Sequence, residues 1–137
     1  MAELAARLGF KAGQLVQEFG WDTDADEALR DAIVDQIAGG DPPGELADED
    51  YDGVADAVLI WWRDGDGDLT DMLVDALTAL DDGGAVWLLT PKAGRKGAVQ
   101  QFDVEEAATT AGLHAMNAVP VADSWTATRL GNRGRGR

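Results

Sequence analysis

The sequence predicts a single α/β domain, with a mostly parallel sheet, helices on both faces and an antiparallel hairpin at the end. Apolar runs of strand length alternate with segments of helical spacing along the 137 residues. Two of these runs are almost unbroken, which is typical of parallel strands buried on both faces. We expect the domain to span residues 1–130, and residues 131–137 (GNRGRGR) to form a disordered basic tail.

The first predicted strand covers residues 14–21 (QLVQEFGW), a short run rich in Val, Phe and Trp. An amphipathic helix follows, because apolar residues recur at steps of three and four up to Ile37. Asp22 or Thr23 is the expected N-cap, with further carboxylates in the first turn, where they meet the positive end of the helix dipole. The glycine pair at 39–40 ends the helix.

A polar connector at residues 41–53 leads to the second strand, an apolar run at 55–62 (ADAVLIWW). The length and continuity of this run favour a central strand. A second helix is predicted from Leu69 to Leu80, with Asp68 as its N-cap, because leucines follow at helical spacing. The polar and glycine residues at 81–84 are expected to end it.

The third strand is predicted at residues 85–90 (AVWLLT), where Pro91 stops it. A basic loop at 92–97 (KAGRKG) then leads to a short helix. Asp103 and Glu106 have the spacing of a capping box, and Gly112 stands where a C-cap belongs. The final hairpin is expected from two extended segments, residues 115–121 and 125–130.

The net charge of −15 is concentrated in one part of the chain. Residues 18–82 hold 21 acidic residues but only two basic ones, Arg30 and Arg63. Such a surface repels a phosphate backbone, so direct DNA binding is not expected, and it attracts basic surfaces. The pattern favours a basic protein partner, such as a sigma factor or an RNA polymerase subunit. The alternative is that the carboxylates only keep the protein soluble.

Several chemistries are excluded or disfavoured by composition. There is no cysteine, so thiol catalysis, disulfides and thiolate metal sites are excluded. The only histidine, His114, has no recognisable triad partner, and we expect no catalytic residues and no enzyme activity. No apolar run is long enough to span a bilayer and no signal-peptide pattern is present, so a cytoplasmic protein without membrane contact is expected.

One acidic segment resembles a calcium-binding loop. Asp64, Asp66 and Asp68 match its first acidic positions and Asp75 its twelfth. Leu69, however, stands at the sixth position, where a sharp turn needs glycine. A turn with a helix cap explains the same residues, so no metal is expected.

Trp62, Arg63, Asp64 and Asp66 are the predicted partner-binding residues. They follow a buried strand, at the sheet edge where parallel α/β folds place their ligands. Trp and Arg are favoured anchors at protein interfaces. We therefore expect a non-enzymatic interaction module with an acidic face, formed by the first helix and the connector after it.

The stretches LVQEFGWD, WWRDGDGDL and VWLLTPKAGRKG resemble a small actinobacterial family of domains of unknown function. The resemblance covers about residues 4–130. It implies a cytoplasmic protein linked to the control of transcription and the stress response through protein contacts. A thiol-based sensing role does not carry over, because the chain lacks cysteine.

The order of elements is also distantly similar to the Rossmann-like, three-layer core of class I methyltransferases. That resemblance implies a glycine-rich loop after the first strand for S-adenosylmethionine, but the loop here reads GWDTDAD, with Gly20 alone. Bulky Trp21 and the carboxylates are expected to crowd and repel the cofactor, so none is predicted. The alternative function is a degenerate methyltransferase-like domain that binds an adenosyl or nucleotide ligand near Gly20, Trp21, Trp62 and Thr90.

Overall fold

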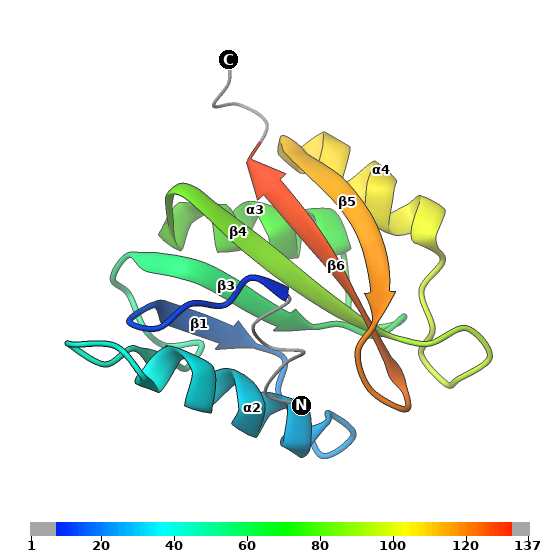
Figure 1. The fold of residues 1–137 in the computed structure, drawn as a ribbon. Helices are drawn as coiled ribbons and strands as arrows, with labels where there is room; N and C mark the ends of the chain where they lie inside the picture. Colours follow the sequence, from blue (N-terminus) through cyan, green and yellow to red (C-terminus); the bar gives the residue numbers. More distant parts are fainter. Residues whose placement is uncertain (1–7, 133–137) are drawn as a thin grey trace.

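The computed structural model describes residues 8–132, which form a three-layer α/β fold (Figure 1). The strands are β1 (Leu15–Phe19), β2 (Glu45–Ala47), β3 (Ala55–Trp61), β4 (Leu80–Pro91), β5 (Leu113–Pro120) and β6 (Trp125–Asn132). The helices are α2 (Glu27–Ala38), α3 (Leu69–Ala79) and α4 (Gln101–Ala111). The predicted fold class is confirmed.

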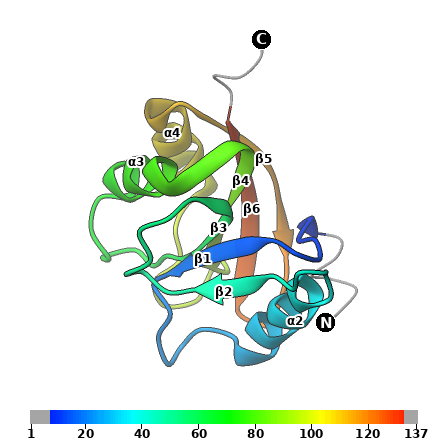
Figure 2. The ribbon, with the colours of Figure 1, turned by 90° about the vertical axis from the view of Figure 1, so that its left-hand side faces the viewer.

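The six strands form one mixed sheet in the order β2-β1-β3-β4-β6-β5. The pairs β2–β1, β1–β3 and β3–β4 are parallel, whereas β6 runs antiparallel to both β4 and β5. Helix α2 lies on one face, and α3 and α4 lie together on the other (Figure 2). The chain leaves β1 for β2 on one side and returns to β3 on the other, so the carboxyl ends of β1 and β3 flank the switch point where such sheets bind ligands.

Two hydrophobic clusters sandwich the sheet, and alternation along β3 divides its side chains between them. Ala57, Leu59 and Trp61 pack with α2, whereas Val58 and Ile60 pack with α3 and α4. Successive side chains of a strand point to opposite faces, so one apolar run supplies both cores. This burial explains why β3 carries almost no polar residue.

Helix α3 begins where the sequence indicated. Asp68 is its N-cap, and the carboxylate accepts a hydrogen bond from the amide of Asp71 at 3.2 Å. Helix α4 ends at Gly112, which adopts the left-handed conformation with φ of 91°. Both predicted caps are confirmed.

The start of α2 was predicted wrongly. Its N-cap is Asp26, whose carboxylate accepts from the amide of Leu29 at 2.8 Å, and not Asp22 or Thr23. The strand before it also stops at Phe19 rather than at residue 21. Residues 20–25 instead form a loop, which a tertiary contact of Asp24 holds, as described below.

Strands β2 and β4 also differ from prediction. The connector at 41–53 contains β2, a three-residue parallel edge strand too short to leave a periodic signal. Strand β4 begins at Leu80, so residues 81–84 extend the strand and do not form a turn after the helix. Leu80 pairs with Ala55, which shows that pairing with β3 overrides the turn-like composition.

The C-terminal part contains two further corrections. Asp103 and Glu106 lie inside α4, which begins at Gln101 after Gln100 and has no side-chain cap, so the predicted capping box is absent. Gly131 and Asn132, assigned to a tail by prediction, belong to β6 and pair with β5. The rest of the predicted tail, residues 133–137, lies outside the described residues.

Candidate functional site

A cleft of about 520 Å³ lies at the carboxyl ends of the parallel strands. Four loops form its walls: those after β1, β3 and β4, and the β5–β6 turn. Backbone hydrogen bonds join these loops, from the amide of Asp64 to the carbonyl of Gly97 and from the amide of Lys92 to the carbonyl of Ser124, both at 2.8 Å. The cleft is therefore built from segments far apart in sequence and held by main-chain contacts.

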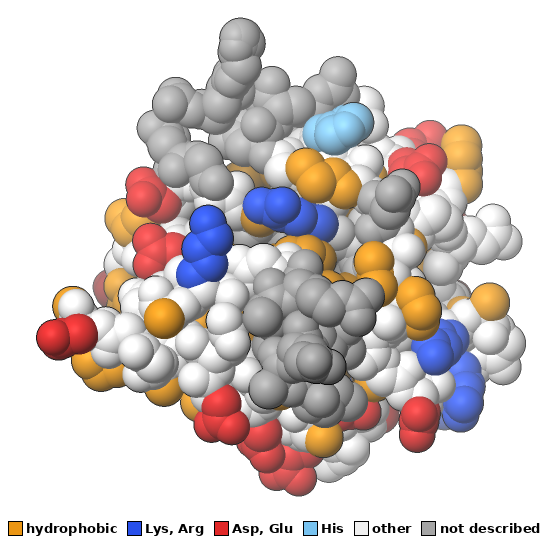
Figure 3. All heavy atoms as spheres, viewed as in Figure 1, with side chains coloured by type: hydrophobic (Ala, Val, Ile, Leu, Met, Phe, Trp, Pro, Cys, Tyr) orange, Lys and Arg blue, Asp and Glu red, His pale blue; other side chains and the backbone are white. Residues whose placement is uncertain are grey.

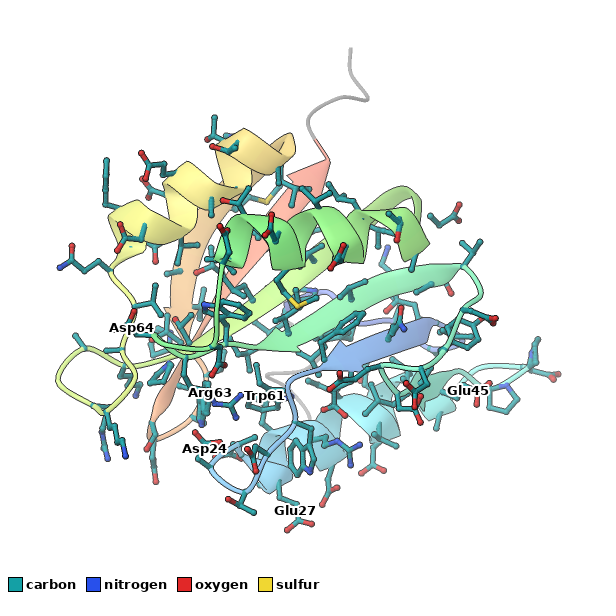
Figure 4. The ribbon with its side chains drawn as sticks, turned by 180° about the vertical axis from the view of Figure 1, so that it is seen from behind. Asp24, Glu27, Glu45, Trp61, Arg63 and Asp64 are labelled. Carbon is teal, nitrogen blue, oxygen red and sulfur yellow. The ribbon has the colours of Figure 1, made fainter. Side chains whose placement is uncertain are left out.

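Arg63 is the central side chain at this edge of the sheet. One terminal nitrogen, Nη1, donates to the carbonyls of Gly20 at 2.7 Å and Trp61 at 3.0 Å. Its Nε and Nη2 donate to the two carboxylate oxygens of Asp24. Figure 4 shows Arg63 between Trp61 and Asp24. The guanidinium thus ties the end of β1 to the end of β3.

Further contacts hold the Arg63 guanidinium in the crevice between β1 and β3. Its guanidinium lies over the ring of Trp125 at 5.3 Å, and Asp66 lies 3.7 Å from Nη1. Trp125 in turn donates its indole N–H to the carbonyl of Asp24 at 3.2 Å. Asp66 also accepts from the amide of Arg63 at 3.0 Å, so this carboxylate organises the turn after β3.

These contacts change the acidity of Asp24. The hydrogen bond from Arg63 lowers the pKa of the Asp24 carboxyl, and the positive charge of the guanidinium adds to the effect, although partial burial opposes it. For Arg63, burial acts to lower the pKa, but the hydrogen bond and charge of Asp24 outweigh it and raise the pKa. The pair is therefore ionised at neutral pH.

A second ion pair lies on the α2 side of β1. Glu18 is buried and accepts from Nε of Arg30 at 2.9 Å and from the indole N–H of Trp61 at 2.9 Å. The hydrogen bond to Glu18 raises the pKa of Arg30. Arg30 also lies over the ring of Trp21 at 4.5 Å, and that ring packs edge-on against Trp61. Trp21 thus covers an ion pair on the α2 side.

The predicted partner-binding residues have different surroundings. Trp62 is 8% exposed and packs in the core under α3 and α4, which argues against a role as an interface anchor. Arg63 is engaged within the chain, as is Asp66. Asp64 lines the cleft and is exposed.

The residues predicted to bind a cofactor also lie in different surroundings. Gly20 is at the crevice with φ of 79°, and Trp21 is 38% exposed beside it. Trp62 is in the core, and Thr90 is buried in β4, paired with Thr126. The structure therefore does not gather these four residues into one site.

S-adenosylmethionine, which this fold implies, does not fit the crevice after β1. A Cβ added at Gly20 would lie 2.2 Å from the carbonyl oxygen of Trp61, so the loop is packed directly on the end of β3. The guanidinium of Arg63 fills what remains between the two strands. The sequence suggested exclusion by Trp21 and the loop carboxylates, whereas in the structure the crevice is occupied by Arg63.

The open cleft beside Arg63 has walls of opposite charge. Asp22, Asp24, Asp64 and Asp66 stand on the β1 and β3 loops, and Arg95 and Lys96 stand on the loop after β4. In Figure 3, basic side chains gather at the lower right, where the loop after β4 lies, and acidic ones follow the lower edge along α2. Arg95 and Lys96 were not among the predicted site residues. The basic loop was the available signal, but it did not reveal that the loop folds over the strand ends.

These features define an α/β domain of the methyltransferase-like fold. Its crevice at the carboxyl ends of β1 and β3 is filled by Arg63. A S-adenosylmethionine-dependent methyltransferase from Aquifex aeolicus is similar, with a TM-score of 0.64, 11% identity and coverage of 95% of this chain and 88% of that one. The mitomycin 7-O-methyltransferase MmcR has a TM-score of 0.66 and 12% identity; the match covers 96% of this chain but 53% of that protein. At these identities the likeness concerns the fold.

The chain belongs to the DUF3052 family, described as proteins of unknown function, whose model matches residues 5–134. It is 48% identical over 126 residues to the uncharacterized protein Rv2239c of Mycobacterium tuberculosis, covering 92% of this chain and 76% of the relative. The family resemblance predicted from the sequence is confirmed. No helix in the described part of the chain has the length and hydrophobicity needed to cross a membrane.

Proposed function

We propose that the protein is a non-enzymatic binding domain on a methyltransferase-like fold, and that it takes a nucleotide in the cleft at the carboxyl edge. The observation that carries the proposal is the position of the cleft, which opens beside the switch point of the sheet while the crevice itself is filled. Its volume of about 520 Å³ lies in the range of roughly 300–1,000 Å³ usual for small-molecule sites.

The chemistry of the walls supports a nucleotide. Arg95 and Lys96 supply positive charge for a phosphate group, which Arg can hold by two parallel hydrogen bonds. Asp22 and Asp64, on the facing loops, supply carboxylates that can accept hydrogen bonds from sugar hydroxyls, as acidic residues do in dinucleotide-binding folds. Asp24 and Asp66 repel a phosphate less, because Arg63 is paired with both.

Thermal and chemical unfolding with AMP, ADP, ATP, inorganic phosphate, S-adenosylmethionine and S-adenosylhomocysteine tests the proposal. A nucleotide present at a hundred times its Kd should stabilise the protein by roughly 2.7 kcal/mol, with no effect from the two adenosyl sulfur compounds. Lys96→Gln should weaken nucleotide binding, whereas the control Lys11→Gln, which removes the same charge outside the cleft, should not. Absence of a nucleotide effect, or an equal effect of both substitutions, would contradict the proposal.

A second candidate function is capture of a basic protein, such as a sigma factor or an RNA polymerase subunit. It is favoured by the exposed carboxylates of α2 and the connector, including Glu27, Asp31, Asp35 and Glu45. Figure 4 shows Glu27 and Glu45 away from the Arg63 crevice. Association through such a face would weaken steeply with salt, because exposed charges are screened within about 8 Å at physiological ionic strength.

Affinity capture from an actinobacterial lysate, at low salt and again at high salt, tests this second function. Recovery of a basic protein at low salt and its loss at high salt are expected. Capture that is indifferent to salt, or that recovers no basic protein, would overturn it. Direct DNA binding through this acidic face is not proposed, because its carboxylates repel the phosphate backbone.

A further inference from the structure

Helices α2 and α3 begin at the carboxyl edge of the sheet, because they follow the parallel strands β1 and β3. In α/β folds a phosphate usually binds the backbone amides at such a helix N-terminus. Here the chain fills both positions itself. The carboxylate of Asp26 accepts from the amide of Leu29 at 2.8 Å at the start of α2. The carboxylate of Asp68 accepts from the amide of Asp71 at 3.2 Å at the start of α3. An N-cap carboxylate repels a second anion, so a phosphate in the cleft depends on side-chain cations.

Two cations are available for that role. Among the described residues that line the cleft, the basic ones are Arg63, Arg95 and Lys96. Arg63 is engaged by Asp24 and by the carbonyls at the ends of β1 and β3. Arg95 and Lys96 together carry two positive charges, which match the roughly two negative charges of one phosphate monoester at neutral pH.

Acidic residues flank the basic loop at residues 92–97 on both sides. The amide of Asp64 donates to the carbonyl of Gly97 at 2.8 Å, and Figure 4 shows Asp64 next to this loop. On the other side, Nη2 of Arg95 donates to the carbonyl of Asp123 at 3.4 Å. The side chains of Asp64 and Asp123 are both exposed. A phosphate chain that extends from the basic loop in either direction therefore approaches a carboxylate.

We propose that the cleft takes a nucleotide with a single phosphate group, and that Asp64 discriminates against longer phosphate chains. The dianion of a monophosphate is balanced by Arg95 and Lys96. ADP and ATP carry further negative charge, which these two side chains cannot balance and which Asp64 repels. The inference rests on the proposed nucleotide function and narrows its class of ligand.

Isothermal titration calorimetry of the full chain with adenosine, AMP, ADP and ATP, and with the guanine series, tests the proposal. Each monophosphate should bind about tenfold more tightly than its triphosphate, because the added phosphates lie near a carboxylate. Each nucleoside should bind more weakly than its monophosphate, because it lacks the group that Arg95 and Lys96 hold.

Two results would overturn the proposal while leaving the nucleotide function in place. One is a triphosphate that binds as tightly as its monophosphate, with or without Mg²⁺. The other is a nucleoside that binds as tightly as its monophosphate. No binding of any nucleotide would overturn the proposed function together with this inference.

Asp64→Asn and Asp31→Asn form a matched pair of variants. Each removes one exposed carboxylate, the first in the cleft and the second on α2. Asparagine keeps the size of the side chain and an oxygen that can accept from a sugar hydroxyl. Asp64→Asn should tighten ATP binding about fivefold and AMP binding less than twofold, whereas Asp31→Asn should change both by less than about twofold. Equal effects of the two variants would show that net charge sets the preference, and would overturn the role of Asp64.

Discussion

Glu18 and Gln17 are neighbours on β1, but they differ in how fully their side-chain oxygens are hydrogen-bonded. Glu18 points to the α2 side, where Arg30 and Trp61 donate to its carboxylate. Gln17 points to the α3 side, where its Nε2 has carbonyl partners but its Oε1 has no donor among residues 8–132. The chain supplies its own cation on one face of the strand and not on the other.

The same contrast holds for the two cavities. At the carboxyl edge Arg63 neutralises Asp24 and fills the crevice that the fold usually keeps for a cofactor. A second cavity of about 310 Å³, on the α3 side of β1, is lined by the exposed acids Glu49, Asp52 and Asp75 and by no Lys or Arg. An acidic protein with few basic residues thus pairs some carboxylates within the chain and leaves others exposed to solvent.

The largest effect on stability is expected from Glu18→Gln. The substitution keeps the shape but turns one acceptor oxygen into a donor facing Arg30, and it removes the charge of a buried pair. We expect a loss of about 3 kcal/mol in the free energy of unfolding, measured with urea. A loss below about 1 kcal/mol would show that Arg30 simply turns to solvent.

Arg63→Ala should cost about 2 kcal/mol, because the carbonyls of Gly20 and Trp61 lose their donor and Asp24 loses its partner. Asp24 is itself largely exposed and regains water, which limits the cost. Arg63→Lys, which keeps the charge but not the planar fork, should recover less than half of the loss. Full recovery of stability by lysine would mean that the positive charge alone, without the planar guanidinium, stabilises the crevice between β1 and β3.

Gln17→Leu should have a smaller effect, about 1 kcal/mol. It removes the hydrogen bonds to Asp48 and Tyr51, but it also removes the unpaired oxygen and adds an apolar side chain to an apolar face. Urea unfolding of this variant beside Glu18→Gln compares the two faces of β1 directly. A cost equal to that of Glu18→Gln would show that the amide is as well satisfied as the carboxylate.

The smallest effect is expected from the acid dependence of the Asp24–Arg63 pair. The pKa of Asp24 is lowered in the folded state, mainly by its hydrogen bond from Arg63, so the pair stabilises the fold above the unfolded value near 3.8. That stability is lost as the pH falls through the lower folded pKa. Unfolding curves of wild type and Asp24→Asn should therefore differ above about pH 4 and converge at lower pH. A constant difference across the range would contradict the assignment.

The predictable part of the fold was the part that local patterns encode. The buried run at residues 55–62, the cap at Asp68 and the left-handed glycine at 112 each depend on a few adjacent residues. The start of α2 was missed because Asp24 is held by Arg63, 39 residues away. The edge strand β2 was missed because three residues are too few to show a period.

Sequence alone determined the α/β class, the acidic half of the chain and the absence of thiol chemistry, since composition and short-range periodicity are sufficient for these. It also placed Gly20 and Arg63 near the ligand edge. Only the tertiary structure decided that Arg63 closes the crevice, that Trp62 is buried in the core, and that the amide oxygen of Gln17 is buried without a hydrogen-bond partner among the described residues. These are consequences of strand register and loop packing, which bring together residues that no local pattern connects.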